Sequence, residues 1–345
     1  MNLTIFKANF LGDNVVFLPV VQELRRRFPD WRITLISHPH YASLYHGALA
    51  PAEVFTVLPD DLRQMWRRPQ DFFRWWSILR DRRPDATLVS YDQGSVAHAL
   101  AWLAGGKLRV GGAGHQVRLR SALTHHVDWR PGWSIAQWNW EIARALLKAL
   151  GKHDWPATPP PPDVSHLAAG TARHPRRIVI HAGSKRAYTQ WPLERFTALA
   201  AQLARDCEVH WITAPDTRRV ALPAEVKAVE SAELPALARH LAGAALFIGN
   251  NSGPMHVANA LGTPLVVVTG PTDFTWDPAW HPANATVLRT PGLACQPCER
   301  VNFLPGHCTN QLEPLACLNR WSVDDVERAC RARLAASPIL QAANR

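Results

Sequence analysis

Asp13 is the first residue whose type and position suggest chemistry. It belongs to Gly12-Asp13-Asn14, which directly follows the strand-like run Leu3 to Phe10 and opens a helical segment. A glycine lets the backbone turn tightly here, and the carboxylate that follows is held at the carboxyl-terminal edge of a sheet. Such a carboxylate could act as a general base on an acceptor hydroxyl. Aspartate is also a preferred N-cap residue, so a helix cap is the competing interpretation.

The second candidate segment reads HAGSKR and begins at His181. It again places a glycine turn after a strand, and Trp191-Pro192 then begins a helix. Small residues let backbone N–H groups approach an anion, and the two basic side chains add positive charge. The pattern favours phosphate binding without a P-loop consensus, although a solvated basic turn has the same composition. The candidate phosphate-binding residues here are Gly183, Ser184, Lys185 and Arg186.

The third candidate segment is the most specific and reads FIGNNSGPMHVANALGTP from Phe247 to Pro264. A strand ends at Gly249, a polar turn follows, and Pro254 suits the first turn of a helix. Free N–H groups at that helix N-terminus favour a pyrophosphate. Purely structural caps are the alternative. The candidate pyrophosphate-binding residues here are Asn250, Asn251, Ser252, Gly253 and His256.

Four of the six cysteines fall within 23 residues, with the spacing Cys295-x2-Cys298-x9-Cys308-x8-Cys317. Four thiolates in a loop-rich stretch can surround one metal ion tetrahedrally, and zinc or iron is the natural choice. The spacing is looser than in zinc ribbons, so buried or oxidation-prone free thiols remain the alternative. The other two cysteines, Cys207 and Cys330, lie in strand and helix patterns typical of core packing.

A fifth segment interleaves aromatic residues with arginines: WRR from Trp66, FFRWW from Phe72, and a further basic run from Arg80 to Arg83. Such a surface could lie against lipid headgroups, with buried rings and with guanidinium groups paired to phosphates. Core packing of the rings beside a solvated arginine face is the alternative. The candidate acceptor or membrane residues are Arg67, Arg68, Trp75 and Arg80.

The composition of the chain bounds these hypotheses. Its 345 residues are 47% hydrophobic, which is enough to bury two cores, and the net charge is +10. Residues 1–155 hold +7 of that charge, which favours an anionic partner for the first half. There is no run of 18 apolar residues, and Lys7 and Asp13 interrupt the first apolar stretch. We therefore expect neither a spanning helix nor a signal peptide, and we expect a cytoplasmic protein in which disulfides are unlikely to form.

Strand-like and helix-like segments alternate throughout the chain, which predicts βαβ units around parallel sheets. The proline-rich stretch 156–163 interrupts the alternation and should form a stiff connector. We expect an N-terminal domain over 1–155, a second domain over 164–321 that includes the cysteine cluster 295–317, and a C-terminal helix and tail over 322–345. Ligands should bind at the carboxyl ends of the strands, in a cleft between the domains.

Three of these segments together resemble glycosyltransferase family 9, the ADP-heptose heptosyltransferases of lipopolysaccharide assembly. The resemblance is carried by GDNVVFLP near the start, by HAGS followed by WPLERF, and by IGNNSGPMHVANALGTPLVVVTGPT, and it runs from about residue 3 to residue 327. It implies a GT-B fold of two Rossmann-like domains and an inverting mechanism. It also implies that the N-terminal domain, 1–155, binds the acceptor and that the C-terminal domain, 164–321, binds the nucleotide-sugar donor. It also implies the roles of single residues: Asp13 matches the catalytic base, Gly183 and Ser184 the phosphate-binding turn, and Ser252, Gly253 and His256 the donor loop.

Two positions depart from the family pattern. Asn251 stands where the family usually has aspartate, and Thr189 stands where it usually has lysine. Lys185 or Arg186 could supply the charge missing at position 189. Similar cysteine clusters occur in the family, including the autotransporter heptosyltransferases, in which the cluster binds iron.

These observations predict a membrane-associated inverting transferase. It would move heptose or a related sugar from ADP-heptose or another nucleotide-diphosphate sugar to the lipopolysaccharide inner core, at the inner face of the cytoplasmic membrane. We expect an anionic, lipid-linked saccharide acceptor, no nucleic acid, no cofactor for transfer, and a structural zinc or iron ion at the cysteine cluster. The alternatives are a protein O-heptosyltransferase acting on Ser or Thr, a GT-B nucleotide-sugar epimerase and a nucleic-acid-binding protein.

Overall fold

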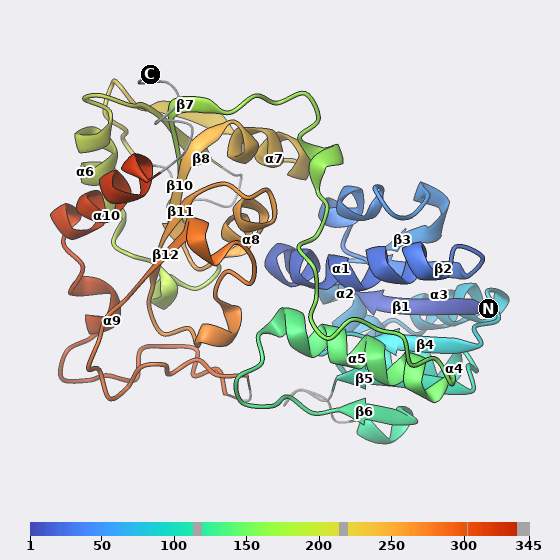
Figure 1. The fold of residues 1–345 in the computed structure, drawn as a ribbon. Coiled ribbons are helices and arrows are strands. Elements are labelled where there is room, and N and C mark those ends of the chain that lie inside the picture. Colours follow the sequence, from blue (N-terminus) through green and yellow to red (C-terminus); the bar gives the residue numbers. More distant parts are fainter. Residues whose placement is uncertain (113–118, 214–219, 302, 337–345) are drawn as a thin grey trace. The chain divides into compact units, whose positions relative to one another are not determined.

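The chain divides into two compact units, Met1–Pro162 and Asp163–Arg345, in a computed structural model (Figure 1). The structure describes residues 1–112, 119–213, 220–301 and 303–336. The tail 337–345, which belongs to the C-terminal segment expected above, lies outside the described residues. Each unit is described by itself below.

The N-terminal unit is built on a parallel six-stranded sheet in the order β3-β2-β1-β4-β5-β6. This is the strand order of a Rossmann fold. The strands are β1 (Asn2–Lys7), β2 (Arg32–Ser37), β3 (Val54–Thr56), β4 (Ala86–Val89), β5 (Leu108–Gly112) and β6 (His125–Val127). The helices are α1 (Leu11–Arg27), α2 (Pro59–Gln64), α3 (Pro69–Asp81), α4 (Ser95–Leu103) and α5 (Ile135–Ala149).

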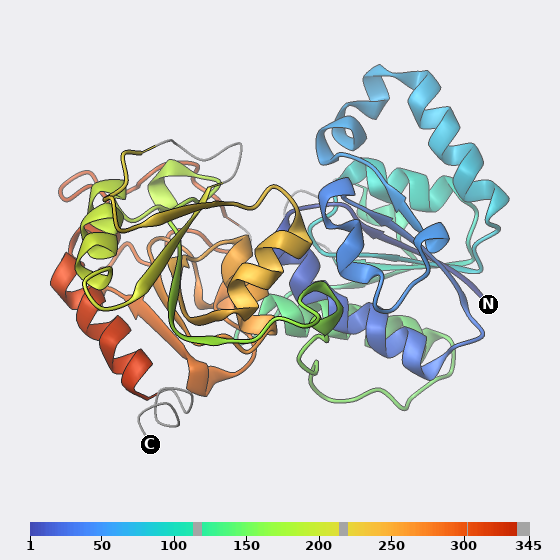
Figure 2. The same ribbon diagram turned by 90° about the horizontal axis from the view of Figure 1, so that it is seen from above.

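Amphipathic helices cover both faces of this sheet. The helices α1 and α5 contact each other, and α3 packs against α4. Helix α5 shows how the sequence specifies such an element: Ser134 caps it by accepting the Gln137 N–H at 3.2 Å, and its buried face includes Trp138, Ile142 and Leu146. In Figure 2 the light-blue segment that contains α2 and α3 stands out from the rest of this unit.

The C-terminal unit repeats the same topology. Its parallel sheet has the order β12-β11-β10-β7-β8-β9, which is again the Rossmann order when β7 is counted as the first strand. The strands are β7 (His174–His181), β8 (Glu208–Thr213), β9 (Lys227–Glu230), β10 (Ala244–Asn250), β11 (Leu265–Thr269) and β12 (Ala285–Arg289). The helices are α6 (Leu193–Leu203), α7 (Leu234–Ala242), α8 (Gly253–Ala260), α9 (Ala316–Asn319) and α10 (Val323–Ala335).

Helix α10 completes the core of this unit. It packs against α6 and against the strands β10, β11 and β12, and it buries Val326, Cys330 and Leu334. The expected core position of Cys330 is therefore confirmed, whereas Cys207 is half-buried beside the same core.

Each sheet has one point at which the strand order reverses, and ligands of open α/β sheets bind outside the strand ends there. In the N-terminal unit this point lies between β1 and β4, and in the C-terminal unit it lies between β7 and β10. The turns after these four strands therefore position any site. Within the described residues, no helix is long and apolar enough to cross a membrane.

Candidate functional site

Asp13 lies at the switch point of the N-terminal sheet. It sits in the first turn of α1, which follows β1, and its Oδ1 accepts a hydrogen bond from the Tyr91 hydroxyl at 2.8 Å. Tyr91 follows β4, the neighbouring strand, so the contact joins the two turns at the reversal of strand order. The positive end of the helix dipole favours the charged carboxylate at this position. The half-buried carboxylate lies where an acceptor could meet a general base.

The helix-cap interpretation of Asp13 is wrong. Strand β1 ends at Lys7, three residues earlier than the sequence suggested, and α1 begins at Leu11. The N-cap position therefore belongs to Phe10, whose side chain has no acceptor atom, and Asp13 lies inside the helix. The contact with Tyr91 then orients the Asp13 carboxylate.

A buried ion pair supports this edge and was not found from the sequence. Lys7 Nζ lies 2.5 Å from Asp92 Oδ2, and the Lys7 side chain is fully buried. Burial raises the pKa of Asp92, but the charge of Lys7 and hydrogen bonds from Lys7, Ser90 and Gln93 outweigh burial and hold that pKa below its ordinary value. Asp92 is therefore charged, and its hydrogen bonds hold the turn that carries Tyr91 in place. Asp13 is the better candidate for a base because Asp92 is committed to this network.

Asn250 joins the two turns at the switch point of the C-terminal sheet. Its side chain is fully buried at the end of β10. The Oδ1 atom accepts the Trp191 N–H at 2.9 Å, and Nδ2 donates to the Ala182 carbonyl at 2.8 Å. Asn250 therefore holds the HAGSKR turn against the donor loop from within, rather than presenting its amide to a ligand.

A glycine is required where these strands meet. A Cβ atom at Gly249 would lie 2.8 Å from the His181 carbonyl oxygen and 2.8 Å from the Phe247 ring. The glycine thus permits the close approach of β10 to β7, and the two turns that follow share one edge.

The N-terminus of α8 lies in the third candidate segment and has first-turn N–H groups that could bind an anion. Ser252 is the N-cap residue, and among the described residues its side chain makes no cap hydrogen bond to the helix. Its hydroxyl donates instead to the Asn250 carbonyl at 3.3 Å. First-turn N–H groups that no side chain caps favour an anion, as does the helix dipole. Gly253, the first residue of α8, adds no side chain that would block approach.

The HAGSKR turn is held by hydroxyl contacts. The Ser184 and Thr189 hydroxyl oxygens lie 2.7 Å apart, and Thr189 donates to the Arg186 carbonyl at 2.7 Å. Thr189, which departs from the family pattern, therefore braces the turn. The charge comes from the exposed Lys185 and from Arg186, whose guanidinium donates to Glu299 at 2.8 Å. Gly183 lies at the start of the turn, beside the Asn250 amide.

His256 is a neutral, buried side chain in α8. Burial lowers the pKa of His256 to about 4. Within the described part of the chain its Nδ1 atom has no hydrogen-bond partner. An unpartnered buried polar atom is costly unless a ligand or water completes it. His256 therefore stands directly behind the helix N-terminus as a neutral group that could complete a contact in the liganded state.

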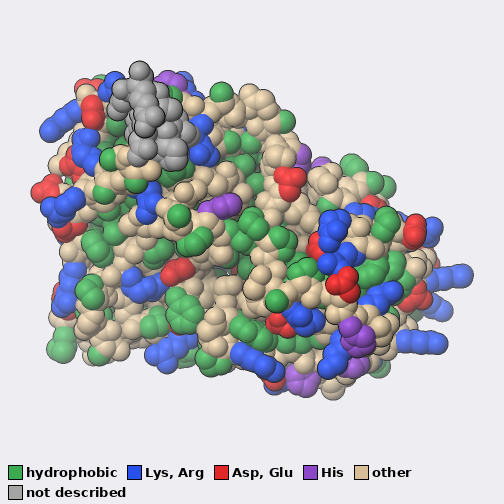
Figure 3. All heavy atoms as spheres, in the orientation of Figure 1, with side chains coloured by type: hydrophobic (Ala, Val, Ile, Leu, Met, Phe, Trp, Pro, Cys, Tyr) green, Lys and Arg blue, Asp and Glu red, His purple; other side chains and the backbone are tan. Residues whose placement is uncertain are grey.

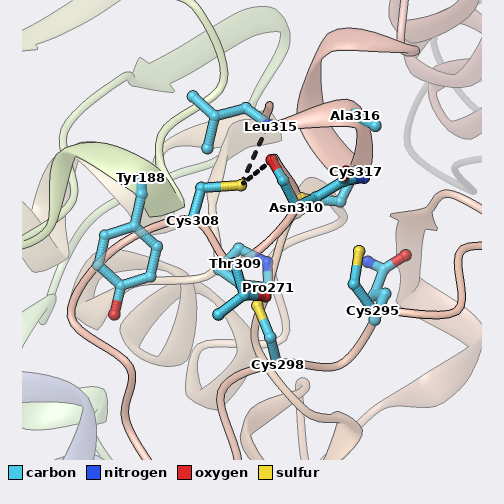
Figure 4. Close-up of a pocket in the computed structure, with 11 residues that line it drawn as sticks. Tyr188, Pro271, Cys295, Cys298, Cys308, Thr309, Asn310, Leu315, Ala316 and Cys317 are labelled. Atoms are coloured by element: carbon cyan, nitrogen blue, oxygen red, sulfur yellow. Dashed lines mark hydrogen bonds between the residues drawn. The ribbon is translucent and has the colours of Figure 1, made fainter. Parts of the chain in front are cut away.

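The four clustered cysteines line one cavity in the segment after β12. Cys295, Cys298, Cys308 and Cys317 surround it together with Tyr188 (Figure 4). Burial, and next the three neighbouring thiols, raise the pKa of the Cys317 thiol to about 12. Cys308 Sγ accepts the Leu315 N–H at 3.3 Å. Among the described residues, no three Cys, His, Asp or Glu side chains converge closely enough to hold a metal ion.

The aromatic and arginine-rich segment divides between core and surface. Trp75 packs against the hydrophobic core of the N-terminal unit, whereas Arg67, Arg68 and Arg80 are exposed. Two large aromatic side chains of α3 and α4 are exposed: Phe73 on α3 at 59% and Trp102 on α4 at 56%. Figure 3 shows Lys and Arg side chains at the end of the N-terminal unit where the N-terminus is marked in Figure 1. Trp102 was missed because it is distant in sequence from the arginines.

Two Rossmann-type units in one chain, with a carboxylate at one switch point and a helix N-terminus without a side-chain cap at the other, fit a GT-B fold. The sequence profile of Glycosyltransferase family 9 (heptosyltransferase) matches residues 73–304. The chain belongs to this family.

Individual relatives agree with the family. Lipopolysaccharide heptosyltransferase 3 of Escherichia coli is 24% identical over 304 residues, which cover 81% of this chain and 86% of that protein. The E. coli heptosyltransferase WaaC with ADP superposes with a TM-score of 0.69 at 18% identity, covering 96% of this chain and 100% of that one. The iron-containing dodecameric glycosyltransferase TibC from enterotoxigenic E. coli superposes with a TM-score of 0.56 at 16% identity, over 97% of this chain and 76% of that chain.

Proposed function

We propose that this glycosyltransferase moves a heptosyl group from ADP-heptose to a hydroxyl of the lipopolysaccharide inner core, with inversion at the anomeric carbon. The observation that carries the proposal is the placement of the two candidate sites. Asp13 stands at one topological switch point, and the turns around Ser184 and Gly253 stand at the other. The likeness to a lipopolysaccharide heptosyltransferase of E. coli and to WaaC solved with ADP supports this donor and this acceptor.

The proposed reaction is a single displacement. Asp13 takes the proton of the acceptor hydroxyl as its oxygen attacks the anomeric carbon of the heptose. The new carbon–oxygen bond forms on the face opposite the diphosphate, and the bond from the anomeric carbon to the phosphate oxygen breaks. ADP leaves with that electron pair. The N–H groups at the start of α8, together with Lys185 and Arg186, stabilise the negative charge that develops on it.

The direct experiment offers purified protein ADP-heptose and heptose-deficient lipopolysaccharide, and follows ADP release and the acceptor mass. We expect a mass increase of one heptose, with no comparable product from UDP- or GDP-sugars. Hydrolysis of the donor without a glycosylated acceptor would contradict the proposed acceptor. Failure of ADP-heptose to react with any acceptor would contradict the donor.

A protein acceptor is the second candidate function. The cavity lined by four cysteines and the fold likeness to the iron-containing TibC are the observations that favour it. The same assay distinguishes the two functions when an autotransporter passenger protein replaces the lipopolysaccharide. Heptose appearing on Ser or Thr side chains, and absent from lipopolysaccharide, would establish the second function in place of the first.

We further propose that the cysteine cavity holds one structural zinc or iron ion. Four thiols on a single cavity are a suitable donor set, and the Leu315 N–H on Cys308 Sγ would stabilise a thiolate there. The four side chains would have to close around the ion. The ion would hold the loop together and take no part in transfer.

We also propose that the enzyme associates peripherally with the inner face of the cytoplasmic membrane. Phe73 and Trp102 supply exposed rings, and Arg67, Arg68 and Arg80 supply positive charge on the same unit. Rings at the headgroup level and arginines beside lipid phosphates are the usual means of such binding.

A further inference from the structure

A buried carboxylate links the cysteine segment to the phosphate-binding turn. Glu299 directly follows Cys298, and its side chain is 3% exposed. Its Oε1 accepts hydrogen bonds from the Arg186 guanidinium at 2.8 Å and from the Tyr188 hydroxyl, and its Oε2 accepts from the Thr272 hydroxyl at 3.0 Å. Two of these three donors, Arg186 and Tyr188, belong to the segment that carries the HAGSKR turn.

We propose that Glu299 is a positioning residue of the donor site, which fixes the Arg186 guanidinium for the diphosphate of the donor. The inference rests on the donor site proposed above. It makes the cysteine segment a part of that site, because the residue that orients Arg186 is the immediate neighbour of Cys298.

The backbone of Glu299 fixes where its carboxylate stands. The Glu299 N–H donates to the Pro271 carbonyl at 3.0 Å, and its carbonyl accepts the Asp273 N–H at 3.1 Å. The residue is thereby tied on both sides to the segment that follows β11. A carboxylate placed by two backbone hydrogen bonds is a fixed point against which a long side chain can be oriented.

The three donors account for the burial of the charge. A buried carboxylate is costly unless it is paired and hydrogen-bonded, and here one cation and two hydroxyls serve both oxygens. Tyr188 remains a donor at neutral pH because burial, and next the hydrogen bond to Glu299, raise its pKa to about 12. Figure 4 shows Tyr188 beside the cysteine cavity, so this one side chain both lines the cavity and donates its hydroxyl to Glu299.

Arg186 can serve two partners at once. A guanidinium carries five N–H donors in a rigid fork, and the Arg186 side chain is 37% exposed. Held at one nitrogen by Glu299, it presents its other N–H groups from a fixed position. Fixing a flexible side chain before binding removes an entropy cost that the ligand would otherwise bear. The negative charge of Glu299 opposes this gain because it repels the diphosphate. Whether removal of that charge weakens or strengthens ADP binding therefore decides whether Glu299 positions Arg186 or repels the ligand.

The test compares ADP with adenosine as ligands in calorimetric titrations. We expect Glu299→Gln to weaken ADP binding about fivefold to tenfold and to leave adenosine unchanged, because only ADP carries the diphosphate. Arg186→Gln should weaken ADP similarly, and the double variant should bind ADP no worse than the Arg186→Gln single variant. The matched control is Glu313→Gln, an exposed carboxylate of the same segment paired with Arg320, which should bind both ligands normally.

Three results would overturn the proposal. An equal loss for ADP and adenosine would make Glu299 a purely structural residue, tighter ADP binding would make it a repulsive group, and additive losses would make it independent of Arg186. Tyr188→Phe, which keeps the carboxylate, provides a milder variant if Glu299→Gln does not fold, and it should weaken ADP about twofold to threefold without affecting adenosine.

Failure of the proposed donor is a separate outcome. If the wild-type protein does not bind ADP, the donor assignment fails, and the same variants are titrated with inorganic pyrophosphate. Weaker pyrophosphate binding by Glu299→Gln would still support the positioning role. Equal binding by both proteins, or none by the wild type, would overturn it.

Discussion

The Asn251 side chain donates a hydrogen bond from Nδ2 to Asp277 Oδ1 at 3.1 Å. The Arg289 Nη2 atom donates to the same carboxylate, at 2.9 Å from Oδ1 and 3.1 Å from Oδ2. Burial raises the pKa of Asp277, and Arg289 offsets only part of that effect. An aspartate at position 251 would place a second carboxylate against this one, which a single arginine already neutralises. Asn251, where the family usually has aspartate, therefore avoids a second negative charge beside Asp277.

Asn251→Asp should destabilise the protein most at neutral and higher pH. Two adjacent carboxylates cannot both ionise without cost, and the hydrogen bond is lost, so we expect about 2 kcal/mol less stability at pH 7.5. A carboxyl group whose pKa is raised in the folded state does not lower the free energy of unfolding at a pH below its unfolded-state pKa. Its destabilising effect grows as the pH rises from there to the folded-state pKa. Urea unfolding against pH measures this. Asn251→Ala, which adds no charge, is the control, and an Asp variant as stable as the wild type at pH 7.5 would contradict the account.

His256 should make the stability of the wild-type protein sensitive to mild acid. Folding lowers the pKa of the His256 imidazole from 6.5 to about 4. The free energy of unfolding is therefore unaffected by this group above pH 6.5, and it decreases as the pH falls toward 4, because the unfolded state gains a proton first. Between pH 7.5 and pH 5 this amounts to about 2 kcal/mol. The stability difference between the wild type and His256→Gln should shrink by that amount over this range. His125→Gln, at an exposed position, serves as the control, and a difference that does not change with pH would contradict the burial of a neutral imidazole.

The cysteine cavity predicts a measurable metal content. Protein purified without oxygen or chelators should contain about one zinc or iron ion per chain by elemental analysis, and Cys298→Ser should lose the ion together with part of the thermal stability. Because burial raises the pKa of Cys317 to about 12, metal binding must displace its proton, and affinity should rise with pH. Cys207→Ser, which lies outside the cavity, should keep the ion. Metal-free wild-type protein of normal stability would leave the cavity as four free thiols.

The exposed rings of α3 and α4 predict binding to anionic vesicles. Wild-type protein should sediment with vesicles of phosphatidylglycerol, less so at high salt, and should bind pure phosphatidylcholine weakly. The double variant Phe73→Gln and Trp102→Gln should lose most of this binding. Phe303→Gln removes an equally exposed ring from the C-terminal unit and should bind normally. Equal sedimentation of all three proteins would place membrane binding elsewhere.

Local patterns were enough to predict the fold class and the segments that carry Asp13, Ser184 and Gly253. Each of these segments comes shortly after an apolar strand and leads into or begins a helix, so its signal lies within a few consecutive residues. The exact strand end was less predictable. Strand β1 stops at Lys7, whose side chain forms the buried pair with Asp92, and no local pattern marks a partner 85 residues away.

The residues that support the site could not be predicted in the same way. Tyr91 reaches Asp13 from the end of a strand that is adjacent in the sheet but distant in sequence, and Glu299 reaches Arg186 across 113 residues. A carboxylate inside a cysteine-rich loop carries no local sign of such a partner. Trp75 illustrates the opposite case, because the composition suggested a surface residue and packing placed its ring against the core.

The most direct test of the central claim is the turnover of Asp13→Asn. This variant keeps the shape and the contact with Tyr91 but removes the proton acceptor, so the rate of heptosyl transfer should fall about 10²- to 10⁴-fold while the affinity for ADP changes less than about twofold. Asp30→Asn, an exposed substitution in the same unit, should leave both unchanged. Near-normal turnover of Asp13→Asn would contradict the assignment of the catalytic base.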